Sequence, residues 1–551
     1  MRFNYSKNNL SPQETLWQRR LEILPGLLSW ITLVGMIILS IFWPFTAAII
    51  TISFYLWWLL RLLYMTLFLV LSWVRLNMEN KTDWMERVHG IDHLISYYKK
   101  QPSANPLQSY SAWSHKQELK KLLDSQQLPA QSQDIYHLVI FPIIKEDQDV
   151  IEPTIKAISQ QQFPSKQIIV IFALEERAQE NIKKGVHAVE NKYKNFLLDC
   201  FTVEHPSDIP GEARVKGANV TYAAKKATEY ITAKNISFEN VIVSCFDADT
   251  VVGENYFACL TYHFMMTPNR QRCSFQPIPV YHNNIWHVPG FARVIETGSS
   301  FFQLIEATNP KKLVTFSSHS MSFKALVETD YWPVDMISDD SAIFWKCYIH
   351  YDGNYQVIPM YVTLSMDMVS AKNWWRTVES VYKQKRRWAW GVENIPIVMR
   401  AFWQNNKIPL WDKLRHGFKL IEGHWSWATW GFILSLEGWL PVLFARHEFA
   451  SSVVYYNVPQ IASTIFNLAS LCLITSIILS IALLPKAPFR YPLLVKIGHA
   501  IEWMMIPFIL LFLGALPALD AQTRLMFGKY LEFFVTGKGQ RQKKIKMKKP
   551  S

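Results

Sequence analysis

Residues 241–250, with the sequence VIVSCFDADT, indicate both a fold class and a chemistry. The first six residues form a short apolar run, which predicts a buried strand. Asp247 and Asp249 follow, and carboxylates at i and i+2 beyond the end of a strand can point the same way. Hard oxygen ligands of this kind suit Mg²⁺ or Mn²⁺. An isolated Asp-x-Asp is more commonly a solvated turn, so its position after a buried strand is what favours a metal site.

Two further apolar runs precede this stretch, YHLVIFP at 136–142 and QIIVIFAL at 167–174. Helix-like segments separate the runs, at 148–161, 177–193 and 214–231. Strands that alternate with helices predict an α/β domain with a mainly parallel sheet. Ligands of such domains bind beyond the carboxyl ends of the strands, which is where Asp247 and Asp249 are expected.

The composition indicates a membrane protein with more than one structural unit. The chain has 551 residues, of which 50% are hydrophobic and only 18% charged, and its formal net charge is +13. A chain of this length exceeds one ordinary domain. The positive charges flank apolar segments, so we expect contact with membrane lipids and no nucleic-acid partner. The six cysteines include no close pair, and neither a zinc site nor a disulfide framework is indicated.

Apolar segments lie on both sides of the predicted α/β domain. No charged residue occurs from Ile23 to Leu60, and the apolar character continues to Val74. Since about 20 helical residues cross a bilayer core, this segment is long enough for two spans with a turn near Trp43-Pro44. Arginines and lysines at both ends of the pair place both flanks in the cytoplasm, namely Arg19, Arg20, Arg75, Lys81 and Arg87.

The C-terminal apolar stretches leave the number of spans open. They lie at 424–445, 458–485 and 502–518. Three spans here would place the basic C-terminal tail outside the cell, against the positive-inside rule. Either 424–445 or the proline-containing 502–518 is therefore expected not to cross in the simple way.

Two more motifs lie between the α/β strands and the C-terminal spans. In Ser338-Asp339-Asp340, one carboxylate could act as a general base, or Asp339 could cap a helix that begins near Ser341. The sequence QKRRW at 384–388 lies in a segment rich in tryptophan and cations. On its own, that segment is typical of an amphipathic helix at a membrane interface.

In their order and spacing, these motifs resemble the membrane-integrated family-2 glycosyltransferases, the group that contains cellulose, chitin and hyaluronan synthases. The resemblance spans residues 136–391. It implies a GT-A (Rossmann-like) glycosyltransferase domain flanked by transmembrane α-helices. It also implies a hexosyltransferase that moves a sugar, with inversion, from a nucleotide-diphosphate sugar to a growing polysaccharide at the cytoplasmic face of the cell (inner) membrane.

The resemblance also assigns roles to single residues. Asp340 matches the catalytic base, and Asp247 and Asp249 match the acids that bind Mg²⁺ or Mn²⁺. Positions matched to nucleotide-sugar binding are Pro142, Glu146, Glu175, Glu176, Lys216, Asn219 and Asp247. Positions matched to the Q-x-x-R-W pattern, which binds acceptor and diphosphate, are Gln384, Arg387 and Trp388.

Some positions depart from the family pattern. Lys145 stands where the family has Asn, and Glu175 and Glu176 stand where it has Asp. The stretch 316–320, FSSHS, lacks the glycine common in the acceptor loop. His319 in that stretch could contact a sugar, although a structural histidine is the more ordinary interpretation.

These predictions divide the chain into seven parts. They are a cytoplasmic N-terminus (1–22), two transmembrane helices (23–75), a polar linker (76–135), a GT-A domain (136–370), amphipathic interfacial helices with the Q-x-x-R-W motif (371–415), a C-terminal transmembrane region (416–520) and a basic cytoplasmic tail (521–551). Two alternatives stay open. One is a non-processive enzyme that adds a sugar to a lipid-linked acceptor. The other is a membrane scaffold or transport protein with a decayed transferase domain, although the acids at the motif positions are present.

Overall fold

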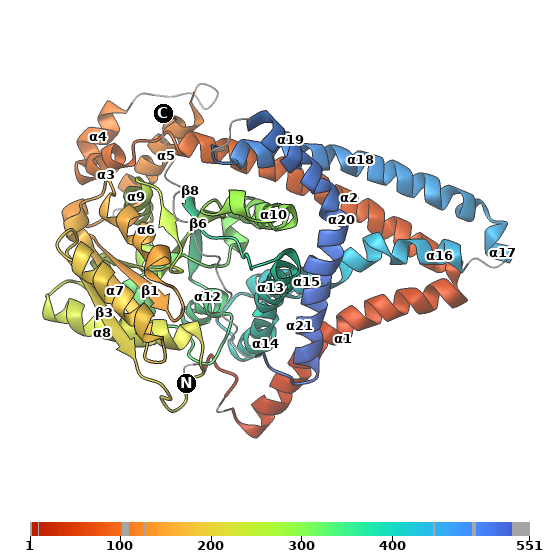
Figure 1. Ribbon diagram of the computed structural model, residues 1–551, viewed down its shortest axis with the longest axis horizontal. Coiled ribbons are helices and arrows are strands. Elements are labelled where there is room, and N and C mark those ends of the chain that lie inside the picture. Colours follow the sequence, from red (N-terminus) through yellow and green to blue (C-terminus); the bar gives the residue numbers. More distant parts are fainter. Residues whose placement is uncertain are drawn as a thin grey trace, which may run out of the picture.

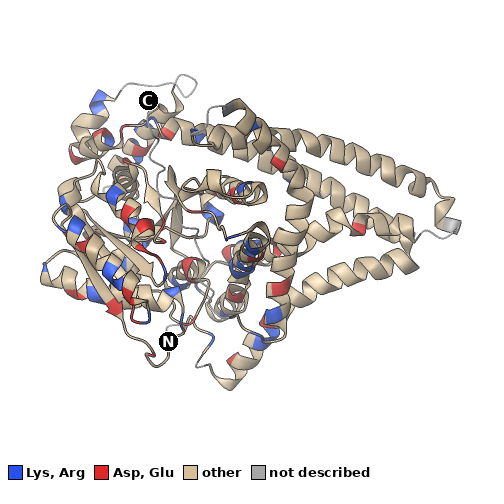
Figure 2. Ribbon diagram, in the orientation of Figure 1, with Lys and Arg blue, Asp and Glu red and all other residues tan. Residues whose placement is uncertain are grey.

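The computed structural model describes residues 3–8, 10–101, 109–125, 128–444, 447–486 and 492–531. It consists of a sheet domain from which long helices extend on one side (Figure 1). Charged residues are concentrated in the sheet domain and are sparse along the long helices (Figure 2). The basic residues expected in the tail beyond 531 lie outside the described residues.

The sheet has eight strands in the order β3-β2-β1-β4-β7-β6-β8-β5. Their bounds are β1 Tyr136–Ile143, β2 Ile168–Glu175, β3 Asp199–His205, β4 Val241–Cys245, β5 Val251–Val252, β6 Cys273–Val280, β7 Ser320–Ser322 and β8 Gln356–Ser365. Strands β3, β2, β1 and β4 are parallel, and so are β6 and β8. β7 pairs antiparallel with both β4 and β6. The α/β class is therefore confirmed, with a sheet that is parallel in its first half and mixed in its second.

The central strands are buried because helices cover both faces of the sheet. On β1, Val139 and Phe141 belong to one apolar cluster, whereas Leu138 and Ile140 belong to another. Side chains alternate between faces along a strand, so these clusters lie on opposite sides of the sheet. The first face is covered by α6 Gln148–Ser159, α7 Glu180–Tyr193 and α9 Tyr256–Met266. The second is covered by α8 Lys216–Ala233 and α12 Asp339–His350. This arrangement explains why β2 is buried at every position.

Four helical segments are long and apolar enough to cross a membrane. They are α1 Pro12–Phe42, α2 Pro44–Glu79, α18 Val453–Leu483 and the segment Leu493–Met526. The helix is interrupted at Trp43, between α1 and α2, and Pro44 is the first residue of the second helix. In Figure 1, α1, α2 and α18 extend away from the sheet, whereas the helices of the fourth segment run across them beside the sheet domain.

The segment that runs across the others is broken into shorter pieces. It contains α19 Pro492–Glu502, α20 Ile506–Phe508, a π-helical stretch Ile509–Ala515 and α21 Leu516–Met526. Helix α21 packs against α1, α13 and α15. The stretch expected at 424–445 is also interrupted, because α15 (Leu410–Ser435) ends before Leu436 and the short α16 (Leu440–Leu443) follows.

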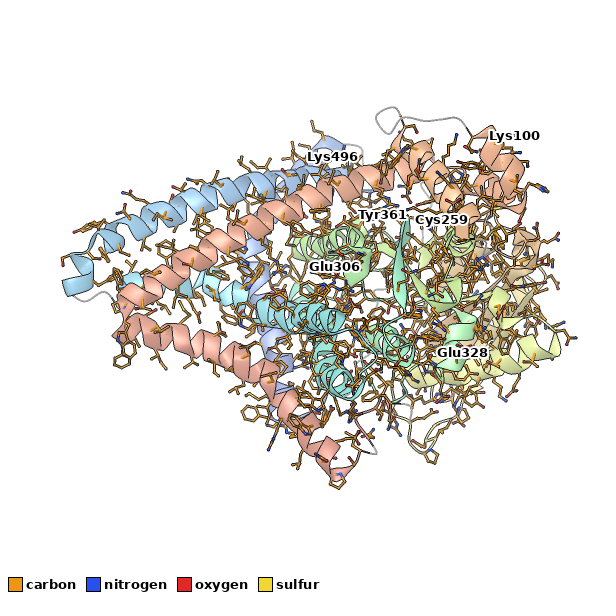
Figure 3. The ribbon with its side chains drawn as sticks, turned by 180° about the vertical axis from the view of Figure 1, so that it is seen from behind. Lys100, Cys259, Glu306, Glu328, Tyr361 and Lys496 are labelled. Carbon is orange, nitrogen blue, oxygen red and sulfur yellow. The ribbon has the colours of Figure 1, made fainter. Side chains whose placement is uncertain are left out.

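Shorter helices join these parts. They are α3 Trp84–Asp92, α4 Leu94–Lys100, α5 Tyr110–Ser125, α10 Gly290–Ala307, α11 Phe323–Glu328, α13 Trp374–Ala389, α14 Asn394–Gln404 and α17 His447–Ala450. The linker helix α3 packs on α9. The end of α2 also contacts the sheet, since the Arg75 guanidinium lies 4.2 Å from the ring centroid of Tyr361 on β8 (Figure 3).

Candidate active site

Three separate elements bring charged residues together at one edge of the sheet. Asp247 follows the end of β4, Lys216 opens α8, and Asp340 lies in the first turn of α12. The Lys216 ammonium nitrogen is 3.1 Å from Oδ1 of Asp247 and 2.9 Å from Oδ1 of Asp340. It is also 3.9 Å from Oδ2 of Asp339. Residues that are far apart in the sequence therefore form one compact cluster of a lysine and three acids.

Burial and mutual contact shift the pKa values of Lys216 and Asp339 in this cluster. The Lys216 side chain is only 9% exposed. Burial by itself disfavours the charged ammonium, but the Asp247 and Asp340 carboxylates outweigh it and raise the pKa of Lys216 well above its usual value. Burial also raises the pKa of Asp339, and the adjacent Asp340 carboxylate adds to that rise. Lys216 therefore stays charged, while Asp339 favours its neutral form.

The interpretation of Asp339 as a helix cap is wrong. Helix α12 begins at Asp339, so the N-cap residue is Ser338, one position earlier. Both acids lie in the first turn of the helix. The positive end of the helix dipole lies at this first turn, and it stabilises negative charge on carboxylates there.

Asp247 and Asp249 have different surroundings. The Asp247 side chain is 27% exposed, and its Oδ2 accepts a 2.6 Å hydrogen bond from the Ser317 hydroxyl. Asp249 is fully buried, and its Oδ2 accepts a 2.9 Å hydrogen bond from the backbone N–H of Asp367. Asp247 therefore faces the open side of the site, and Asp249 lies behind it.

Asp247 and Asp249 offer carboxylate oxygens, which suit a divalent cation whose remaining ligands are substrate phosphates and water. Within the described ranges, no group of three or more His, Cys, Asp and Glu side chains is placed to hold a metal by itself. Mg²⁺ sites commonly use one or two carboxylates and complete their coordination with substrate phosphates and water. The lysine ammonium beside Asp247 shows that this position accommodates positive charge.

The residues matched to nucleotide binding lie at the same edge of the sheet but differ in their contacts. Glu146 Oε2 accepts the N–H groups of Ile144 at 2.9 Å and Lys145 at 3.0 Å, which closes the turn after β1. Pro142 lies within β1. Glu175 ends β2 and lies 3.2 Å from Arg177.

Two more of these residues, Asn219 and Glu176, make hydrogen bonds to the backbone of other segments. The Asn219 side chain is 2% exposed and donates a 2.8 Å hydrogen bond to the carbonyl of Ala173, which joins α8 to β2. Glu176 accepts a 2.6 Å hydrogen bond from the backbone N–H of Ser207. Asn219 thus holds the start of α8, and with it Lys216, against the sheet.

The Q-x-x-R-W residues lie on α13. Arg387 is near enough to Asp339 for its charge to oppose the rise that burial causes in the pKa of that acid. The Trp388 ring lies 6.5 Å from the ring of Tyr281, with an angle of 36° between the planes. Gln384 is 8% exposed, in the turn of α13 that precedes Trp388.

Sequence reasoning missed a buried ion pair that supports Trp388. Lys385 and Glu296 are 3% and 1% exposed, and the Lys385 nitrogen is 2.9 Å from Oε1 of Glu296. The same nitrogen lies 3.7 Å from the centroid of the Trp388 ring. Because Glu296 lies on α10, only the folded chain brings this partner to the motif.

The departure at 316–320 also has a structural explanation. Ser318 adopts a positive φ of 60°, a conformation that glycine adopts more readily. Its hydroxyl accepts the N–H of Asp247 at 3.2 Å. His319 is 1% exposed, and its Nδ1 lies 2.9 Å from the carbonyl of Phe316. Burial lowers the pKa of His319, so the structural interpretation of this histidine is the better supported one.

With this geometry established, comparison with known proteins is informative. Residues 242–516 match the family described as glycosyl transferase family group 2. The chain carries a family-2 glycosyltransferase domain. Poly-β-1,6-N-acetyl-D-glucosamine synthase of Staphylococcus epidermidis is 22% identical over 265 residues, which cover 47% of this chain and 55% of that protein. The chain thus spans about half the length of this relative.

Solved structures resemble the glycosyltransferase only weakly. The mannosyltransferase PcManGT from Pyrobaculum calidifontis, in complex with GDP-Man and Mn²⁺, has a TM-score of 0.39 and 13% identity, covering 80% of this chain and 100% of that one. A fragment of S. aureus TarS in complex with UDP has a TM-score of 0.33 and 10% identity, covering 61% and 90%. The assignment to glycosyltransferases therefore depends on the family match.

Proposed function

We propose that this glycosyltransferase moves a sugar, with inversion, from a nucleotide-sugar donor to a growing polysaccharide at the cytoplasmic face of a membrane. The observation that carries the proposal is the cluster in which Lys216 contacts both Asp247 and Asp340. It brings a candidate metal ligand and a candidate base into contact with the same buried cation. The synthase from Staphylococcus epidermidis supports a polymeric product.

The donor site is built from oxygen ligands and fixed positive charges. Asp247 and Asp249 would hold Mg²⁺ or Mn²⁺, which when bound neutralises the charge that develops on a leaving diphosphate. Lys216 and Arg387 add cations that do not need to move into place, and a guanidinium can bind phosphate through two hydrogen bonds. Glu175, the last residue of β2, and Glu176, which follows it, are proposed to contact the base and ribose.

Asp340 is proposed as the general base that takes the proton of the acceptor hydroxyl. Its side chain is 25% exposed, whereas that of Asp339 is 4% exposed. An acceptor can therefore reach Asp340, and Asp339 lies behind it. A positioned base of this kind contributes about 10²–10⁴ in rate.

The aromatic rings of Trp388 and Tyr281 are proposed to receive the acceptor sugar. Sugar rings present flat apolar faces that can pack on aromatic rings, and the Trp388 and Tyr281 rings lie 6.5 Å apart. Gln384, in the same helix, would orient the acceptor hydroxyl groups by hydrogen bonding.

The cytoplasmic side is supported by contacts between the chain ends and the catalytic domain. Lys7 lies 3.7 Å from Glu393, close to α12, and Tyr530 donates to Glu22 at the start of α1. The N-terminal segment, the catalytic domain and the end of α21 are therefore on one side. Arg19, Arg20 and Arg75 lie at that end of α1 and α2, which is the arrangement that the positive-inside rule predicts for the cytoplasm.

The test uses the full chain in lipid nanodiscs. Nucleotide release would be measured with a panel of UDP- and GDP-sugars, including UDP-N-acetylglucosamine, in the presence of Mg²⁺ or Mn²⁺. Metal-dependent release from one donor together with long products supports the proposal. Single additions to lipid would favour the lipid-acceptor alternative, and the absence of release with every donor and acceptor would contradict transferase activity.

A further inference from the structure

A buried carboxylate lies behind the turn that carries the acid pair. Glu393 follows α13 in the chain and is 4% exposed. Its Oε1 accepts three hydrogen bonds of 2.9 Å, from the N–H of Ile337 and from the N–H and hydroxyl of Ser338. Its Oε2 accepts a 3.0 Å hydrogen bond from the indole N–H of Trp390. One side chain thus fixes the two residues that immediately precede Asp339.

Asn394 fixes the other side of the same turn. Its Nδ2 donates to the hydroxyl of Ser338 at 3.0 Å and to that of Ser341 at 3.2 Å. Ser338 makes no side-chain cap on its own helix, because its hydroxyl is engaged by this cluster. Glu393 and Asn394 therefore hold residues on both sides of Asp339 and Asp340, and so define where α12 begins.

The N-terminal segment of the chain is seated on these two residues. The Tyr5 hydroxyl donates a 2.7 Å hydrogen bond to Oδ1 of Asn394, and Tyr5 is 6% exposed. Arg400 on α14 donates to the carbonyl of Ser6 at 2.8 Å. Figure 1 shows the N-terminus beside α12 and α14.

Lys7 supplies the charge that the buried carboxylate needs. Burial raises the pKa of Glu393, and the Lys7 ammonium, 3.7 Å from its Oε2, acts in the opposite direction. The Lys7 side chain is 23% exposed, so water screens this pair only in part. The segment thus favours the charged form of Glu393, which is the better acceptor for the four donors around it.

We infer that Glu393 is a positioning residue for Asp340, and that Tyr5 and Lys7 of the N-terminal segment hold Glu393 and Asn394 in place. The assignment of Asp340 as the reacting group rests on the proposed function, whereas the clamp on residues 337–338 does not. Loss of Glu393 would leave two backbone N–H groups without their acceptor and release the start of α12. A misplacement of about 1 Å in a reacting group can cost about 10²-fold in rate.

The first measurement is amide hydrogen exchange of peptides that contain residues 336–341, on the full chain in nanodiscs. Glu393→Ala should exchange at least about tenfold faster at Ile337 and Ser338, since both hydrogen bonds are lost. Glu393→Gln keeps a carbonyl oxygen for these donors but loses the charge, so its exchange should be slower than that of Glu393→Ala and faster than that of the wild type. Tyr5→Phe and Lys7→Ala should show intermediate exchange. Lys407→Ala, which removes the same charge from a side chain that is 79% exposed, is the matched control.

The second measurement is the split between kcat and donor KM. Glu393→Ala should lower kcat by about 10- to 100-fold with donor KM changed less than about threefold, because the donor residues are untouched. Glu393→Gln should keep more of kcat than Glu393→Ala, because one carbonyl oxygen still accepts from Ile337 and Ser338. Should Glu393→Ala not fold, Tyr5→Phe and Lys7→Ala carry both measurements.

The outcomes separate the two proposals. Unchanged exchange at residues 337–338 in the Glu393 and N-terminal variants would overturn the clamp, whatever the activity. Faster exchange with an unchanged kcat would show a purely structural role and overturn the positioning of Asp340. A wild-type chain without any transfer would contradict the proposed function, while the exchange measurement would still decide whether the clamp exists.

Discussion

The ammonium nitrogen of Lys216 lies 2.9 Å from Oδ1 of Asp340 and 3.1 Å from Oδ1 of Asp247. One buried cation therefore touches both the proposed base and a proposed metal ligand. Without it, three acids would face one another in a poorly solvated site. Lys216 compensates the negative charge of these acids, and it lies where the diphosphate of a donor is expected to bind.

Replacement of Lys216 by methionine keeps most of its volume and removes its charge. We expect kcat/KM for the donor to fall, most strongly at low pH. The acid limb of the pH–rate profile should move to higher pH, because Asp339 loses the positive charge of Lys216 that opposes the rise in its pKa. The measurement is kcat/KM for the donor between about pH 5.5 and 9, a range in which the titration of a carboxyl group with a raised pKa is visible.

Lys216→Arg is the matched control, since it keeps the charge near Asp247 and Asp340. Its pH profile should stay close to that of the wild type even if its kcat is lower. A Lys216→Met variant with an unshifted acid limb would show that the lysine does not influence the ionisation of Asp339 during turnover.

Asp340→Asn and Asp339→Asn should have very different effects. Asp340→Asn removes the proposed base and should lower kcat by about 10²–10⁴, with donor affinity little changed. Asp339 has a raised pKa and favours its neutral form, which asparagine resembles in shape and charge. Asp339→Asn should therefore keep much more activity. The check is single-turnover transfer together with nucleotide binding for both variants. Equal losses would contradict the assignment of Asp340 as the base.

Removal of the divalent metal should abolish transfer reversibly. Treatment with a chelator should stop nucleotide release, and added Mn²⁺ should restore it. Asp247→Asn and Asp249→Ala should each eliminate both the activity and its response to Mn²⁺, because each variant removes one of the two carboxylates proposed to hold the metal. Metal-dependent binding of a nucleoside diphosphate provides a readout that does not need turnover. The surface variant Asp352→Asn serves as control, and a persistent Mn²⁺ response in either site variant would place the metal elsewhere.

The parts of the fold with strong local signals could be predicted from the sequence. The apolar runs at 136–142, 167–174 and 241–246 correspond to β1, β2 and β4, because central parallel strands are buried on both faces and read as continuous apolar sequence. β7 spans only Ser320–Ser322 and carries no such signal. Its antiparallel pairing with β4 and β6 is fixed by tertiary contacts, so the mixed half of the sheet was not predicted.

The site was predictable as a set of residues rather than as a set of contacts. The sequence indicated Lys216, Asp247 and Asp340, but not that the lysine lies between the two acids. Its assignment of Asn219 to the nucleotide stays a prediction, and no local pattern indicates that the amide of this residue donates to the carbonyl of Ala173. The contact of Tyr5 with Asn394 joins opposite ends of the chain, and no local pattern reports such a pair.

The buried pair of Lys385 and Glu296 gives a prediction about stability. Lys385→Met leaves the Glu296 carboxylate buried without its cation and should destabilise the catalytic domain by about 3–5 kcal/mol. The double variant Lys385→Met/Glu296→Leu removes both charges and should recover most of that loss. The measurement is denaturant-induced unfolding in detergent, monitored by tryptophan fluorescence.

The control for this pair lies on the same helix. Lys383 and Glu379 form an i,i+4 pair whose side chains are 37% and 61% exposed, so Lys383→Met should leave the unfolding midpoint unchanged. If the single and double variants of the buried pair are equally destabilised, its contribution is packing rather than charge compensation.

Because the Lys385 ammonium also lies 3.7 Å from the Trp388 ring, Lys385→Met should shift that indole even where the domain stays folded. Shorter products from Lys385→Met than from Lys383→Met, under conditions in which both are folded, would show that the buried pair serves the acceptor site through Trp388.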